Sequence, residues 1–147
     1  MEARPVLLNV LECGCPRCRI GKMFIERNPY KLRTTMKMNE HCPVCGQPFE
    51  LEVGFYYGSS FVSYALSVAV SVATFIAWWV LIGFSLNDNR VFYWLALNAL
   101  VLVGLQPVLM RLARSIWLVF FVRYDKDWRT HPAAVPERTN EDQKNNW

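Results

Sequence analysis

The sequence FVSYALSVAVSVATFIAWWVLIGF, which runs from Phe61 to Phe84, decides the fold class of this chain. It lies inside a longer stretch, residues 53–87, that contains no charged residue. A second apolar run, VFYWLALNALVLVGLQPVLM, extends from Val91 to Met110. A bilayer core is about 30 Å thick and a helix rises about 1.5 Å per residue, so about 20 apolar residues can cross it. The sequence therefore predicts a membrane protein with two transmembrane helices, at about residues 59–84 and 91–110.

The polar ends of the chain are short. About 60 residues precede the first predicted helix and about 37 follow the second. Domains below about 70–80 residues usually need a metal, disulfides or a partner for stability. We find no serine–histidine–aspartate set, catalytic carboxylate pair or phosphate-binding glycine loop, and we expect no enzyme. A net charge of +4 is also mild for a dedicated nucleic-acid binder.

Cysteines carry the main chemical signal. Four of the five form two C-x-x-C pairs, Cys15 with Cys18 and Cys42 with Cys45, and a proline follows the first cysteine of each pair. Each such turn places two sulfurs on one side of a tight loop, and zinc takes four tetrahedral ligands. Two turns of this kind predict a structural zinc site made by Cys15, Cys18, Cys42 and Cys45.

We expect this site to hold together a small β module of the zinc-ribbon type over residues 1–54. Period-two and apolar segments indicate short strands at residues 23–25, 30–38 and 49–53, and Pro5 to Leu11 is read as a strand or a short buried segment. Basic neighbours are expected to favour the thiolate form of the cysteines. These neighbours are Arg17, Arg19, Lys22, Lys31, Arg33 and Lys37.

Other readings of the cysteines stay open. The four could pair as disulfides, as in a secreted domain, or act in thiol redox chemistry or as a metallochaperone. A zinc ribbon could also bind nucleic acid, although the balanced charge of this segment argues against that partner. Cys13 is read as incidental, and His41 as a neighbour of the metal shell or a solvated residue rather than a ligand.

Charge predicts the orientation in the membrane. Residues 1–60 hold eight Lys or Arg and residues 111–147 hold seven, whereas the connecting loop holds only Arg90. Positive loops stay inside, so both termini are expected in the cytoplasm, where thiols remain reduced. Residues 111–124 either continue the second helix or lie along the membrane surface with their arginines at phosphate depth. The tail, residues 125–147, is expected to be flexible.

The first predicted helix has two stripes of small residues. Ser63, Ser67, Ser71 and Thr74 form one stripe, and Ala65, Ala69, Ala73 and Ala77 form the other. Small residues at this spacing let helices approach closely in lipid. The stripes serve either a larger membrane partner or the chain's own second helix, with a homodimer as a further possibility. Asn98 and Gln106 in the second helix are expected to bond to a neighbouring helix.

Three segments together resemble one family. They are CPRC with GKMF (Cys15–Cys18, Gly21–Phe24), HCPVCGQPFE (His41–Glu50), and RLARSIW (Arg111–Trp117) after the two helices. This pattern, from about Cys15 to Asp125, resembles the DUF983 family of small bacterial membrane proteins; Arg19 departs from the glycine common there. The resemblance implies a protein of the bacterial inner membrane, and an accessory subunit or assembly factor of a respiratory, cytochrome oxidase-type complex.

Overall fold

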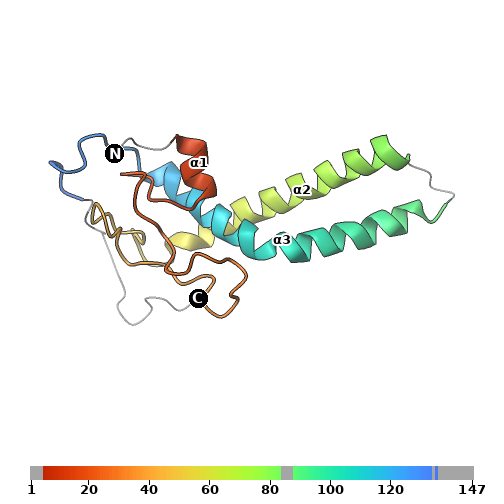
Figure 1. Cartoon of the computed structure of the whole chain (residues 1–147), viewed down its shortest axis with the longest axis horizontal. Coiled ribbons are helices and arrows are strands. Elements are labelled where there is room, and N and C mark those ends of the chain that lie inside the picture. The colour runs from red at the N-terminus through yellow and green to blue at the C-terminus, as the bar shows by residue number, and fades with distance from the viewer. Residues whose placement is uncertain (1–4, 84–87, 134, 136–147) are drawn as a thin grey trace.

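A computed structural model describes residues 5–83, 88–133 and 135 of the chain. The elements are α1 (Val6–Leu11), the 3₁₀ turn η1 (Phe55–Gly58), α2 (Ser59–Ile82) and α3 (Arg90–Phe121). α2 and α3 form a long antiparallel hairpin, and the described residues before α2 and after α3 gather where α2 begins and α3 ends (Figure 1). We call residues 5–54, which precede η1, the module.

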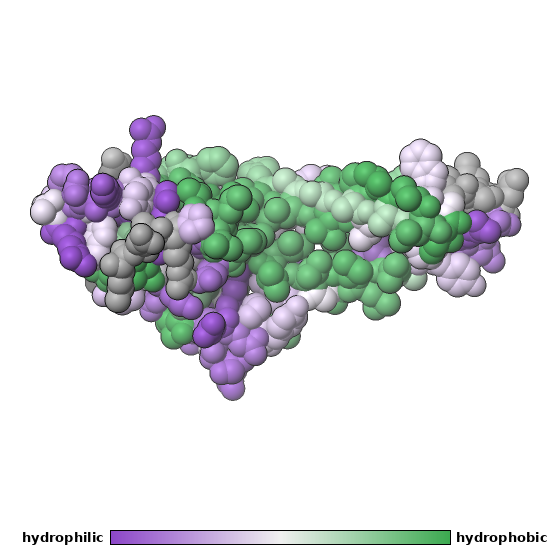
Figure 2. Space-filling view, turned by 45° about the horizontal axis from the view of Figure 1, so that its top comes forward, coloured by the Kyte–Doolittle hydropathy of each residue, from purple (hydrophilic) through white to green (hydrophobic). Residues whose placement is uncertain are grey.

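The two apolar helices expected from the sequence are present. Phe55–Ile82 and Arg90–Phe121 are long enough to cross a membrane, and their most apolar 18-residue windows have mean hydropathies of 2.2 and 1.7. On the face that Figure 2 shows, hydrophobic residues cover most of the length of the hairpin, while hydrophilic residues gather over the module and at the far end of the hairpin. Residue 84, where the first helix was expected to end, lies outside the described residues; α2 itself ends at Ile82.

α3 is longer than a membrane span requires. Its 32 residues correspond to about 48 Å, against about 30 Å for a bilayer core. The helix continues through Pro107 and past Met110 to Phe121, so residues 111–121 extend the second helix instead of lying apart on a surface. This extension enters the module, where Leu118 is completely buried. α3 thus supplies part of the module's core.

The serine stripe of α2 faces α3. Asn98 donates from Nδ2 to Ser71 Oγ (3.3 Å) and accepts at Oδ1 from Thr74 Oγ1 (3.0 Å). The rings of Phe75 and Trp94 pack edge to face 5.2 Å apart. These contacts show that the polar stripe serves the chain's own hairpin. The alanine stripe of α2 is exposed, and so is Gln106, which was expected to bond to a neighbouring helix.

No β-strand forms among the described residues, so the predicted β module of the zinc-ribbon type is not confirmed. Three isolated antiparallel bridges are present instead, Gly14 with Lys22, Phe24 with Met38, and His41 with Pro48. Residues 5–11, read as a strand or short buried segment, form the mostly exposed helix α1 because leucine-rich sequences without alternation favour a helix. Near the cysteines, the backbone N–H and C=O groups form their hydrogen bonds within turns. Single bridges are therefore enough, and no sheet ladder is needed to pair these groups.

Two arginines at the base of the hairpin fasten the module to α3. Arg111 donates to the carbonyls of Thr35 (2.8 Å), Glu26 (2.9 Å), Arg27 (3.3 Å) and Asn28 (3.3 Å). Arg114 donates to the Met36 carbonyl (3.2 Å) and lies over the Tyr56 ring. Both side chains are buried. Their N–H groups are therefore used on the backbone of residues 26–36, as in a helix that continues into the module rather than one that lies along a membrane surface.

We predict that Arg111→Lys loosens the segment of residues 26–36. A lysine ammonium lacks the planar fork that reaches several carbonyls at once, so some of those carbonyls lose their donor at a cost of about 3 kcal/mol. Limited trypsin digestion in mild detergent should cleave this segment at least about tenfold faster than in the parent protein.

The matched control is Arg123→Lys, since Arg123 follows α3 and is exposed. Its digestion rate at residues 26–36 should equal that of the parent protein. Equal rates for the two variants would show that the Arg111 bonds do not hold the segment.

Candidate metal centre

The two cysteine pairs adopt the same backbone turn. In the first, the Arg19 N–H donates to the Cys15 carbonyl at 2.9 Å; in the second, the Gly46 N–H donates to the Cys42 carbonyl at 2.9 Å. The N–H groups of Cys15 and Cys42 each close their loop with a further bond of 2.8 Å, to the carbonyls of Gly21 and Gln47. The bridges Gly14–Lys22 and His41–Pro48 sit just outside the two loops. Two nearly equivalent turns thus present four sulfurs.

The residue after each pair has a positive φ. Gly46 has φ +70°, which glycine adopts at no steric cost, and Arg19 has φ +55°. The tight turn therefore forms even though Arg19 replaces glycine. The Arg19 guanidinium lies 3.9 Å from the centre of the Tyr124 ring, a cation–π contact that offsets part of the backbone strain.

The four sulfurs converge on one point. The Sγ atoms of Cys15, Cys18, Cys42 and Cys45 all lie within 4.8 Å of one another. Cys15 and Cys45 are 3.7 Å apart, as are Cys18 and Cys42. Sulfurs bound to one zinc at about 2.3 Å in a tetrahedron would be about 3.8 Å apart, and a disulfide would require about 2.0 Å. All five cysteines are free thiols. The donor set fits a tetrahedral thiolate site, which the sequence predicted with these same four residues.

Close packing surrounds the sulfurs. Cys15, Cys18 and Cys42 are buried, and Cys45 is half-buried. The Gly21 N–H points at Cys18 Sγ (3.5 Å), and a side chain at Gly21 would collide with Cys42 Sγ. Glycine is required at this position because the second turn approaches its backbone directly. The sulfurs are thus confined by the fold.

The thiols share their protons unequally. Hydrogen bonds with Cys15 and Cys42 lower the pKa of Cys18 well below that of an ordinary thiol. The same interactions raise the pKa of Cys15, and burial raises the pKa of Cys45 to about 12. One sulfur is therefore stabilised as the thiolate by its neighbours, and a divalent cation would replace the remaining protons.

Three of the six expected basic neighbours are engaged elsewhere. Arg17 pairs with Asp125 and Arg19 stacks on Tyr124, while Lys31 pairs with Glu26 at 2.7 Å. The hydrogen bonds among the thiols, rather than these three side chains, account for the low pKa of Cys18. His41 is exposed and lies outside the group of four sulfurs.

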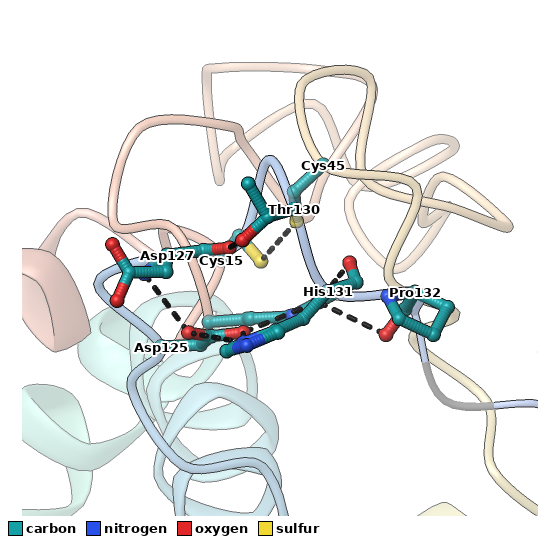
Figure 3. Close-up of polar contacts among 8 residues, drawn as sticks. Cys15, Cys45, Asp125, Asp127, Thr130, His131 and Pro132 are labelled. Atoms are coloured by element: carbon teal, nitrogen blue, oxygen red, sulfur yellow. Dashed lines mark hydrogen bonds and ion pairs between the residues drawn. The ribbon is translucent and has the colours of Figure 1, made fainter.

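Arg17 joins the first turn to the far end of the chain. Its Nη2 donates to Asp125 Oδ2 (3.3 Å) and to the carbonyls of His131 (2.9 Å) and Pro132 (3.0 Å). The Asp125 N–H donates to the Arg17 carbonyl (3.2 Å), and His131 Nδ1 lies 3.1 Å from Asp125 Oδ2. Figure 3 shows this segment beside Cys15 and Cys45. The first part of the expected flexible tail thus packs against the cysteine turn; residues 136–147 lie outside the described residues.

Two further residues near the site escaped sequence reasoning. Asn9 in α1 is buried and donates to the carbonyls of Gly14 (3.3 Å) and Cys15 (3.2 Å). The sequence offered one indication of this role, because Asn9 is the single polar residue in the apolar stretch VLLNVL. Cys13, read as incidental, lies outside the sulfur cluster, and burial raises the pKa of its thiol to about 11. Nothing in the sequence indicated the pairing of Arg17 with Asp125, 108 residues away.

Comparison with protein families gives one match, to the family described as "Protein of unknown function (DUF983)", over residues 32–121. The chain belongs to the DUF983 family. The matched region contains the second cysteine pair and both long helices of this DUF983 protein, and it begins after the first pair. It is thus narrower than the resemblance from Cys15 to Asp125. No curated protein and no solved structure matches the chain.

We predict an unusual stability order at residue 19. Arg19→Ala should destabilise the module, because it keeps the positive φ and loses the contact with Tyr124. Arg19→Gly should be more stable than Arg19→Ala by about 1 kcal/mol, since glycine removes the strain. Denaturant unfolding of the metal-loaded protein, followed by near-UV circular dichroism, measures the difference.

Arg33 provides the control, as an exposed residue in the module without a positive φ. There the usual order should hold, with the alanine variant at least as stable as the glycine variant. The same order at both positions would contradict the strained turn at Arg19.

Proposed function

We propose that this DUF983 protein is a non-catalytic integral membrane protein with a structural zinc ion bound by Cys15, Cys18, Cys42 and Cys45. The observation that carries the proposal is the convergence of four sulfurs from two separate turns, all within 4.8 Å of one another and two pairs of them 3.7 Å apart. The described part of the module has no strand, and its small core is built largely around these cysteines. An ion joining the four sulfurs would therefore contribute directly to folding of the module.

The exposed surface of the hairpin supports insertion in a membrane. In the most apolar 18-residue window of the first helix no residue is buried by the rest of the chain, and in that of the second 17% are buried. A core helix of a water-soluble protein would be covered on most sides. A bilayer would cover this surface, and the distribution of Lys and Arg supports a cytoplasmic module.

A larger membrane complex is the partner we propose for the hairpin. The alanine stripe on α2 is exposed, in contrast to the serine stripe that contacts α3. Small residues at four-residue spacing allow a further helix to approach closely. A respiratory, cytochrome oxidase-type complex is the partner that the family resemblance implies, and a homodimer is the competing use of the same face. No nucleic acid is part of this proposal.

The metal content of the purified protein tests the site. We predict one zinc ion per chain in protein freshly purified in mild detergent, measured by elemental analysis. Cys15→Ser and Cys42→Ser should each lower this content by more than about half, because a three-thiolate site binds zinc much more weakly. Both variants should also be digested faster within the module.

Cys13→Ser is the matched control, since Cys13 lies next to the first turn and outside the group of four sulfurs. It should retain its zinc. Thiols that react readily in the zinc-loaded protein, or copper in place of zinc, would instead support the redox or metallochaperone reading.

Purification in mild detergent tests the partner. An affinity-tagged chain should retain a respiratory complex, and Ala69→Leu with Ala73→Leu should weaken that retention at least about tenfold by blocking close approach. The control exchanges Val68 and Val72 for leucine, because these exposed residues of α2 are already large. A self-associated chain without other subunits would favour the homodimer.

A further inference from the structure

A cavity of about 280 Å³ opens between the module and the base of the hairpin. It lies between the end of α1, residues 22–29 and α3. Figure 1 shows α1 and the orange part of the module on opposite sides of α3. The lining includes Leu11, Lys22, Arg27, Val108, Arg111 and Leu112. This cavity is separate from the cysteine site, and the proposed structural zinc does not account for it.

Arg111 brings a buried positive charge to the cavity wall. The residue is 5% exposed, and its guanidinium lies against the Phe24 ring. Its four hydrogen bonds all go to carbonyls, and no carboxylate forms an ion pair with it in the described part of the chain. These bonds satisfy most of its N–H groups without neutralising its charge. The Glu26 carboxylate acts on this charge without a direct ion pair and is itself paired with Lys31, so a further anion in the cavity would be stabilised.

Two more cations line the same cavity. Neither Lys22 nor Arg27 forms a side-chain ion pair among residues 5–83, 88–133 and 135. The cavity also includes Glu12 and Glu26, of which Glu26 is paired with Lys31 at 2.7 Å. The cavity is thus lined by three cations and two carboxylates. This small excess of positive charge attracts an anion with one negative charge and disfavours a highly charged anion.

Apart from Arg111, the wall that α3 contributes to the cavity is apolar. Val108 and Leu112 lie one turn apart, and Arg111 is the first charged residue after the apolar run from Val91 to Met110. The cavity therefore lies at the level where the apolar surface of the hairpin ends. At this level a bilayer presents phosphates next to glycerol and the first acyl carbons. A ligand that matches both walls is an amphiphile with one phosphate.

We propose that this cavity binds the phosphodiester headgroup of a phospholipid, with Lys22, Arg27 and Arg111 around the phosphate and Val108 and Leu112 against the start of the acyl chains. The proposal rests on the proposed function, because the hairpin must lie in a bilayer for the cavity to meet a lipid. The bound lipid would join the module to the membrane surface through a contact distinct from the two helices.

Native mass spectrometry of the full zinc-loaded chain in mild detergent tests this site, with dioleoyl phosphatidylglycerol as the probe. The test variant combines Lys22→Ser and Arg27→Ser, which are exposed positions. The control combines Arg33→Ser and Lys37→Ser, which remove the same charge from exposed positions outside the cavity. The test variant should bind the lipid at least about tenfold more weakly than the parent, and the control within about twofold.

Two further ligands test whether the cavity binds a lipid or only a free phosphate. Inorganic phosphate and glycerophosphate, added at the same concentration, should bind at least about tenfold more weakly than the lipid, because they make no contact with the apolar wall. Equal binding of these ions would overturn the lipid assignment. If the test and control variants weaken lipid binding equally, the assignment of the site to this cavity is overturned, because exposed positive charges anywhere on the module would then account for the binding.

Separate readouts distinguish this inference from the proposed function. Zinc content and resistance of membranes to alkaline extraction report on the metal site and on membrane insertion. Normal values for both, with no selective loss of lipid in the test variant, would overturn only the headgroup site. If the double variant loses zinc, Arg27→Gln alone replaces it in the same comparison.

Discussion

Four sulfur atoms within 4.8 Å of one another are the constraint on which the module depends. The described residues before η1 contain only a short helix and single bridges, so no sheet ladder holds them together. Two equivalent turns converge instead, and Met23, Phe24 and Phe49 pack around the cysteines. In so small a core, the relative position of the two turns follows from the sulfurs.

The second constraint is the length of α3. A helix that ended at the membrane boundary would leave the module with only its own residues to bury. Because α3 continues to Phe121, Leu118 and the following Val122 enter the core. Arg111 and Arg114 then bind the carbonyls of residues 26–36, which lack a ladder of their own. The module and the hairpin are thus one packed unit.

The chain also closes on itself around the first cysteine turn. Arg17, between Cys15 and Cys18, binds Asp125 and the carbonyls of His131 and Pro132. Asn9 in α1 binds the same turn from the other side. Residues from the beginning and the end of the described chain therefore surround a site whose ligands lie between them. The burial of Cys15 and Cys18 follows from this arrangement.

The sequence alone was sufficient for the two apolar helices and for the grouping of four sulfurs, because length, hydropathy and C-x-x-C spacing are local properties. It was not sufficient for the secondary structure of the module, since short alternating segments such as residues 49–53 pair only if a partner strand is available. It also left open whether residues 111–124 follow the helix. In the structure the helix continues, and Arg111 on this extension binds carbonyls that lie 76 and 85 residues earlier in the sequence. These contacts exist only in the folded chain. The tertiary structure decided the contacts of Arg17 and Arg111 because a buried guanidinium binds whichever carbonyls the fold brings near, and no local pattern encodes that choice.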